Sequence, residues 1–155
     1  MFVVSLFLCS TLPAQTSSPA PGTSKLDDIS GMYSFLQDGE FLQLTVDDTG
    51  HLTGFISRYG DSDSDRGAFL NQFFKSGSLE GNKLSFTTET VHAVWYEFKG
   101  VIERPQGKTP ADEGYRLLRG KLTENRGDLD KKVSSKSRVV GFKSFPKDLE
   151  SGPRN

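Results

Sequence analysis

The sequence predicts an all-β protein, an eight-stranded antiparallel up-and-down β-barrel in one domain. Short runs of alternating apolar and polar residues are separated by turns rich in glycine, aspartate and asparagine. No stretch combines helical periodicity with helix caps. About 120 residues remain once the two ends are set aside, which fits one domain of ordinary size.

Residues 1–14 form an apolar run that ends in the small residue Ala14, a pattern typical of a secretory signal peptide. We therefore expect export to the periplasm or the extracellular space; the alternative is a buried N-terminal strand. The run lacks a basic start, so either the true start lies upstream or the signal is weak. Leu8 before Cys9 disfavours a lipid anchor. Cleavage after Ala14 removes Cys9, the only cysteine, and with it any disulfide or thiolate metal site.

The polar ends set the limits of the domain. Residues 15–28 are rich in serine, threonine and proline and predict a flexible linker, whereas residues 148–155 predict a disordered tail. The barrel domain is therefore predicted over 29–147.

The first hairpin carries the clearest strand signal. Asp38-Gly39 separates runs 32–37 and 40–46, and Asp-Gly supplies the positive φ angles that a two-residue hairpin turn needs. Turn signals at 47–50 and at Gly81-Asn82 mark later hairpins. The other predicted strands are 52–57, 69–79, 84–88, 93–103, 115–123 and 138–145. Segment 125–136, which is charged and contains glycine, predicts a mobile excursion between the last two strands.

Local connections make these strands a meander, which leaves two exposed edges unless the sheet closes. Closure into a barrel is the usual solution for this number of strands, and a β-sandwich is the alternative. Glycines inside the predicted strands favour the barrel, because they let a curved sheet bend; they are Gly54, Gly100, Gly120 and Gly141.

Alternation assigns the two faces of the sheet. The predicted inward residues share the more apolar face of each strand; they are Leu42, Leu44, Val46, Val94, Tyr96, Phe98, Ile102, Leu118 and Leu122. Phe41, Trp95 and Leu117 fall on the opposite face. Three interpretations of them stay open: a homo-oligomer interface, a ligand wall, or isolated exposed apolar side chains, which are common.

Three short motifs suggest a known architecture. Gly31-Met-Tyr33 is similar to a Gly-x-Trp that opens a first strand, and Gly50-His-Leu-Thr-Gly54 to a Gly-x-Leu-Thr-Gly turn. Val140-Gly-Phe-Lys-Ser-Phe145 is similar to a closing Val-Gly-His-Asp-x-Phe. Over roughly residues 31–147 the chain thus resembles the avidin and streptavidin barrels, and more loosely the lipocalin-like barrels.

The biotin contacts of that family are not matched. Phe35 stands at the family's asparagine, Ile56-Ser57-Arg58 at its Tyr-x-Ser, and Lys143 at its aspartate; Leu117 falls near its late tryptophan. Burying a ureido ring against such residues would leave polar atoms unpaired, at about 1–3 kcal/mol each. We therefore do not predict biotin binding.

The resemblance implies instead a cup for one small, partly apolar ligand. The predicted ligand-binding residues are Tyr33, Phe35, Leu44, Ile56, Tyr96, Phe98 and Leu118. No cofactor and no catalysis are expected, because the usual sets of nucleophile, base and metal ligands are missing. The rival hypothesis is an interaction or structural barrel, filled by its own side chains, whose outer surface around Trp95 meets another protein.

One short motif points weakly to a metal. Asp61, Asp63 and Asp65 alternate as in a calcium loop, but Arg66 stands where the sharp-turn glycine belongs and Gln72 where the bidentate glutamate belongs. A solvated loop is the favoured interpretation.

The remaining polar signals exclude several classes. His51 and His92 lack neighbours for a zinc set, and we expect both at the surface. Residues 107–109 mimic the end of a phosphate-binding loop without its earlier glycine. Lys and Arg total 19 against 20 Asp and Glu, scattered along the chain, which argues against a nucleic-acid partner. No apolar run is long enough to span a membrane.

Overall fold

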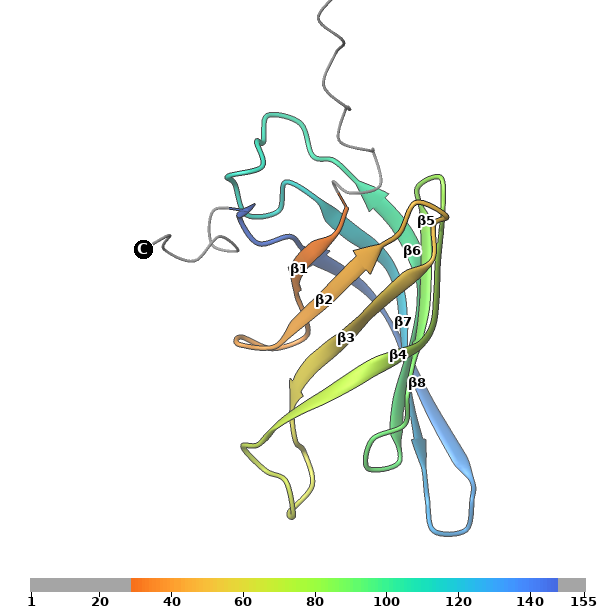
Figure 1. Cartoon of the computed structure of the whole chain (residues 1–155). Coiled ribbons are helices and arrows are strands. Elements are labelled where there is room, and N and C mark those ends of the chain that lie inside the picture. The colour runs from red at the N-terminus through yellow and green to blue at the C-terminus, as the bar shows by residue number, and fades with distance from the viewer. Residues whose placement is uncertain (1–28, 148–155) are drawn as a thin grey trace, which may run out of the picture.

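The computed structural model describes residues 29–147. The predicted signal peptide (1–14) with Cys9, the linker (15–28) and the tail (148–155) lie outside the described residues. Within the described part, eight antiparallel strands form one curled sheet in sequence order (Figure 1), which confirms the all-β class and the meander. The strands are β1 (Gly31–Ser34), β2 (Phe41–Val46), β3 (Leu52–Tyr59), β4 (Phe69–Glu80), β5 (Lys83–Thr88), β6 (Val94–Glu103), β7 (Leu117–Gly127) and β8 (Val133–Lys143).

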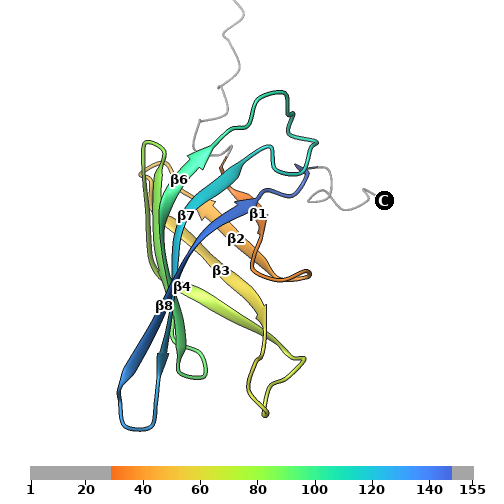
Figure 2. The same ribbon diagram turned by 180° about the vertical axis from the view of Figure 1, so that it is seen from behind.

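The sheet curls until its first and last strands meet. Tyr33 forms a bridge with Ser144, the Phe145 amide donates to the Met32 carbonyl at 2.9 Å, and the Lys143 amide donates to Ser34 Oγ at 3.0 Å. Since β1 has four residues and β8 has eleven, the two strands meet over a short stretch only. Figure 2 shows β8 leaving β1 and continuing beside β7 toward the other end.

We call that other end the mouth. It carries the connections 35–40, 60–68, 89–93 and 128–132, because every odd-numbered strand of this meander runs toward it. No helix among residues 29–147 is long and apolar enough to cross a membrane.

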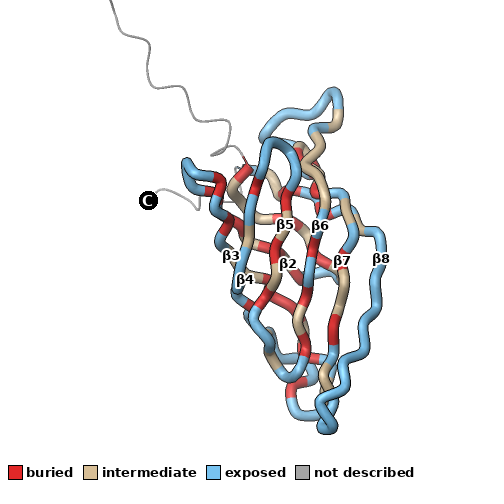
Figure 3. The backbone as a smooth tube through the Cα atoms, turned by 90° about the vertical axis from the view of Figure 1, so that its right-hand side faces the viewer, coloured by how far each residue is buried: buried red, intermediate tan, exposed pale blue. Residues whose placement is uncertain are grey.

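Aromatic side chains fill the interior. Ring contacts run without a break from Phe74 through Phe86, Phe98 and Phe142 to Phe35 and Tyr96, with centroids 4.4 to 5.8 Å apart. The predicted inward faces are confirmed, since their residues are buried apart from the half-buried Ile102. Figure 3 shows buried and more exposed positions alternating along β6 and β7, whereas β8 is mostly exposed.

Two of the predicted strand glycines are needed for close packing. Gly100 on β6 pairs directly with Gly120 on β7, and the edge of the Phe98 ring lies beside both. A Cβ on Gly120 would lie 2.5 Å from Gly100 Cα and 2.4 Å from the Lys99 carbonyl oxygen. The absence of side chains lets the strands curve around the aromatic core.

The predicted two-residue turn at Asp38-Gly39 is wrong in detail. β1 ends at Ser34, and Asp38 and Gly39 lie inside a turn closed by the Glu40 amide donating to the Gln37 carbonyl at 3.0 Å. The reason is Glu40, whose buried carboxylate accepts from the amides of Gln37 (3.1 Å) and Tyr59 (3.0 Å). This tie to β3 fixes the turn in place of the shortest hairpin.

The predicted mobile excursion over 125–136 is also wrong. β7 continues to Gly127 and β8 starts at Val133, so the connection is only 128–132. Polar pairs across the two strands support the extension, among them Thr123 with Ser137 (2.9 Å) and Asn125 with Ser135 (2.6 Å).

Candidate ligand site at the mouth

The residues predicted to line an apolar cup lie in the core. Six of them are buried among other apolar side chains: Tyr33, Phe35, Leu44, Ile56, Phe98 and Leu118. The hydroxyl of Tyr33 donates to the Ile29 carbonyl at 2.6 Å. Tyr96, the seventh, is buried too but also borders a cavity at the mouth. The predicted residues therefore pack together in the core, and Tyr96 lies where the core meets the polar mouth cavity.

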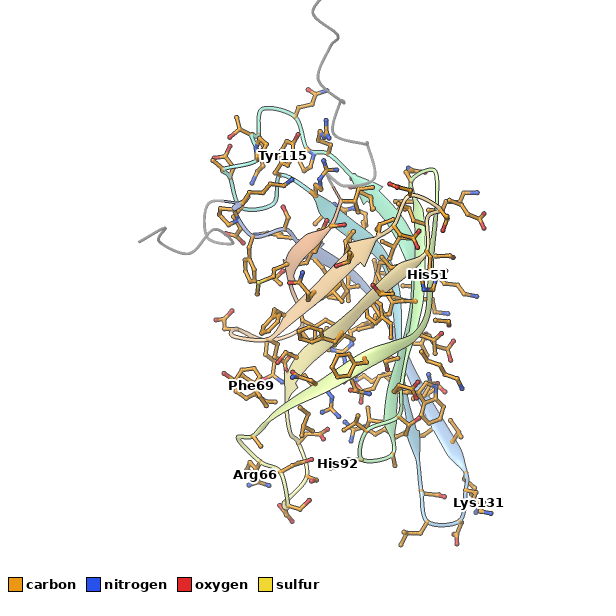
Figure 4. The ribbon with its side chains drawn as sticks, viewed as in Figure 1. His51, Arg66, Phe69, His92, Tyr115 and Lys131 are labelled. Carbon is orange, nitrogen blue, oxygen red and sulfur yellow. The ribbon has the colours of Figure 1, made fainter. Side chains whose placement is uncertain are left out.

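The mouth cavity has a volume of about 150 Å³. It lies where the inward-facing residues, every second one along a strand, change from apolar to charged. On β3 the change is from Ile56 to Arg58, and on β7 it is from Leu122 to Glu124. Figure 4 views this end from the side and labels Arg66, His92 and Lys131 on its loops and Phe69 at the start of β4. The lining residues are Leu36, Gln37, Glu40, Arg58, Tyr59, Asp61, Tyr96, Glu124, Arg126 and Arg138.

Arg58 is the most deeply placed charge of this cavity, with only 4% of its side chain exposed. Its Nε donates to Gln72 Oε1 at 2.8 Å, and its Nη1 donates to the Tyr59 carbonyl at 3.1 Å. The guanidinium lies 5.9 Å from the centre of the Tyr96 ring. Nη2 is buried and has no hydrogen-bond partner within the described residues. A buried charged donor without an acceptor is unfavourable, so this atom is suited to an external acceptor.

Gln72 holds the Arg58 guanidinium in place. It is fully buried on β4, and its Nε2 donates to the carbonyls of Val94 (2.7 Å) and Glu89 (3.0 Å). These two bonds fix the orientation of the amide and turn its oxygen toward Arg58. The guanidinium is therefore positioned before any ligand arrives.

Ion pairs form the rim of the cavity. Arg126 pairs with Asp61 across the mouth and with Glu124 at 2.7 Å, and Arg138 reaches the same Glu124 at 3.1 Å. The hydrogen bond from Arg126 lowers the pKa of Asp61, and Asp61 and Glu124 together raise the pKa of Arg126. Burial raises the pKa of Tyr96 to about 12.

The three aspartates that alternate as in a calcium loop do not converge. Asp61 pairs with Arg126 and Asp63 with Arg66 at 2.7 Å, while Asp65 accepts from the Ser62 amide at 2.8 Å. Within residues 29–147, no group of three or more His, Cys, Asp or Glu side chains could hold a metal ion.

Asp65 instead joins two loops of the mouth. It accepts from Ser62 Oγ at 2.5 Å, and its other oxygen bonds to Nδ1 of His92, in connection 89–93. The Ser62 hydroxyl, and then His92, lower the pKa of Asp65 to about 2. His92 is half-exposed, as expected, but its aspartate partner was not predicted.

Sequence reasoning missed Arg58 and Gln72 as site residues although a signal was present. Alternation places Arg58 on the same face as Leu52 and Ile56, and Gln72 on the same face as Phe74. Polar residues in an inward row are unusual and deserve a functional interpretation. The pairing of Arg58 with Gln72 depends on strand register, which has no local signature.

The curled eight-stranded meander and its mouth define the class: this is an avidin-like β-barrel fold, as the motifs suggested. Two solved structures of rhizavidin are similar to it. The rhizavidin–biotin complex has a TM-score of 0.58 and 11% identity and covers 79% of this chain and 98% of that one. A second structure of rhizavidin has a TM-score of 0.59 and 10% identity, and the match covers 84% of this chain and 89% of that one. No family model and no curated protein matches the sequence. At these identities the likeness concerns the fold alone.

Proposed function

We propose that this chain is an exported, non-enzymatic β-barrel that binds a small ligand at its mouth. The observation that carries the proposal is Arg58, which is buried beside the mouth cavity, held by Gln72, and left with Nη2 unpaired among residues 29–147. Polar groups that converge in a concave site are the usual mark of ligand recognition.

The cavity favours a compact, polar ligand. A volume of about 150 Å³ holds a small organic group, or a few waters at about 30 Å³ each. Leu36 and the Tyr96 ring provide limited apolar contact, whereas the arginines provide hydrogen-bond donors. The ligand site is thus shallower and more polar than the cup expected from the sequence.

Biotin does not fit this site. Rhizavidin has been solved in complex with biotin, but in this chain the interior is filled by packed rings, including Phe35 and Phe98. We propose a ligand of different chemistry, and we expect no retention of the protein on immobilised biotin.

The polar clusters of the mouth do not favour catalysis. Ser62, Asp65 and His92 lie together, yet Asp65 stands between the other two, so the histidine is not placed to take the serine proton. The arrangement is that of a structural link between loops.

Native mass spectrometry of the full chain, purified without detergent, tests the proposal. We expect wild type to carry an additional mass that is lost on denaturation. The fraction of protein that carries it should be lower in Arg58→Met and unchanged in Arg119→Met. Arg119 is the matched control, since it is an exposed arginine paired with Glu103 at 3.1 Å on the outer face. Thermal unfolding checks that Arg58→Met folds; it should, because methionine replaces a buried, incompletely paired charge. A bare mass after incubation with lipid and metabolite extracts would contradict the proposal.

A second candidate is an interaction barrel, favoured by the filled interior and by an outer row of aromatic residues. Phe41, Phe55 and Phe73 contact one another across β2, β3 and β4, with centroids 5.9 and 5.5 Å apart, and Phe73 is 59% exposed. This row is a better protein contact than Trp95, which is half-buried. A bare mass in native spectra, together with a partner lost in Phe73→Thr, would favour this function.

A further inference from the structure

We propose that the ligand of the mouth is a small carboxylate anion and that Asp61 occupies its place until it binds. This inference rests on the proposed ligand site and names its chemistry. In the ligand-free protein the Asp61 carboxylate pairs with Arg126; in the complex the carboxylate of the ligand replaces it between Arg58 and Arg126.

The cationic side of the site suits a carboxylate. Arg58, Arg126 and Arg138 reach the cavity from β3, β7 and β8. A guanidinium offers two parallel donors to a carboxylate, a match that a single ammonium group lacks. In Arg58, Gln72 and the Tyr59 carbonyl occupy Nε and Nη1, which leaves Nη2 for the ligand.

Asp61 is the carboxylate that can be exchanged. Its Oδ1 lies 3.7 Å from Arg58 Nη1, too far for a hydrogen bond, while its Oδ2 pairs with Arg126. Asp61 therefore bridges the two arginines without satisfying Arg58. Its side chain is 45% exposed and belongs to connection 60–68, so it can turn into water without breaking a strand pair. Exposed ion pairs of this kind contribute little to stability.

The other two carboxylates are fixed. Glu40 is buried and accepts from the amides of Gln37 and Tyr59. Glu124 is 14% exposed and binds both Arg126 and Arg138. Moving Glu40 would break the hydrogen bonds that hold the turn, and moving Glu124 would break the ion pairs of the rim. Replacing the Asp61 carboxylate with that of a ligand keeps the charge of the site unchanged, whereas a neutral ligand in its place would leave Arg126 with Glu124 alone and Arg58 without the nearby Asp61 carboxylate.

Tyr96 and Leu36 define the body of the ligand. The Tyr96 ring lies beside the Arg58 guanidinium, and both residues border the cavity. A compact apolar group attached to the carboxylate would contact this ring, and benzoate is a suitable probe. Benzamide has the same shape without the charge and is the matched neutral compound.

Isothermal titration of benzoate and benzamide into the full-length protein tests the inference. We expect benzoate to bind wild type, benzamide to bind about tenfold more weakly or not at all, and Arg58→Met to lose about tenfold in benzoate affinity. Asp61→Asn removes the internal competitor and should bind benzoate about two- to fivefold more tightly. Asp63→Asn is the matched control, because it removes the same charge from the same connection at a side chain that is 97% exposed and paired only with Arg66.

Several outcomes would overturn the inference. Equal binding of benzoate and benzamide would show that charge is not recognised. Equal affinities of Asp61→Asn and Asp63→Asn would remove the role of Asp61 as a stand-in, and absence of benzoate binding would exclude the site as a carboxylate site. If the native spectra still contained a ligand that Arg58→Met loses, the proposed function would stand while its carboxylate chemistry failed.

Discussion

At the scale of single residues, two neighbouring strands pack closely at the glycine pair of β6 and β7. The Gly100 and Gly120 backbones face each other beneath the Phe98 ring, with no room for a methyl group. The curvature that brings β6 and β7 around the aromatic core therefore depends on two missing side chains.

The substitution Gly120→Ala should destabilise the protein by about 1–3 kcal/mol, because the new Cβ would meet backbone atoms of β6 that cannot move independently. Chemical denaturation measures this free energy of unfolding. Gly127→Ala is the control on the same strand, where a Cβ would meet only Ala93 atoms at 3.9 Å. Equal losses for the two variants would contradict the packing described for Gly120.

The hydrogen bonds that Asp65 makes with Ser62 and His92 lead to a prediction about acid stability. The pKa of Asp65 is lowered from 3.8 to about 2, so its ionised form stabilises the fold above about pH 4 and this contribution is lost as the pH falls to about 2. The difference in unfolding free energy between wild type and Asp65→Asn should therefore shrink over that range. A difference that stays constant from pH 5 to about pH 2 would show that these hydrogen bonds do not lower the pKa of Asp65.

Residue types alone predict part of the site. Alternation identifies Tyr96 as inward, and the same rule applied to Arg58 would have marked it as an inward charge. His92 gave no such signal, because its partner Asp65 lies 27 residues away in another loop. Contacts between loops depend on how the whole sheet curls, so no local sequence pattern predicts them.

At the scale of elements, the β7–β8 hairpin shows how polar strands escape sequence analysis. Segment 125–136 looked like a loop because it is charged and has little apolar alternation. In the structure these residues extend beyond the core, where both faces of a strand can be polar. Hydroxyl and amide pairs take the place of apolar contacts, as between Asn125 and Ser135.

Hydrogen exchange tests this extension. The pairing of β7 with β8 from Leu117 to Gly127 predicts protected amides on both sides of the 128–132 connection, with protection falling toward that turn. Exchange at unprotected rates throughout 125–136 would support the mobile excursion instead. Amides of the partnered core strand β6 provide the internal standard.

The Asp-Gly pair predicted the position of the first turn correctly but not the type of turn. Asp38 and Gly39 do lie at the tip of the first hairpin, yet Glu40 sets the turn by binding amides of the turn and of β3. A carboxylate that bonds across strands can override the preference of an Asp-Gly pair. Such a contact depends on tertiary structure and is absent from propensity rules.

At the scale of the whole molecule, strand number, order and inward faces followed from the sequence because a meander uses only local connections. The filling of the interior by side chains did not follow from the sequence. Side chains such as Phe35 and Phe142 fill the centre of the barrel, and the cavity lies at the mouth, where the inward-facing residues become charged. A fold-level resemblance to ligand-binding barrels places the cup but not its depth or polarity.

The central claim is that the ligand binds at the mouth, beside Arg58. The most direct measurement is mapping of amide chemical-shift changes by NMR while benzoate is added to the full chain. We expect the largest changes to cluster around Arg58, Asp61, Tyr96 and Arg126. Changes centred on Tyr115 and Arg116 at the opposite end, or along Phe41 and Phe73 on the outer face, would contradict it.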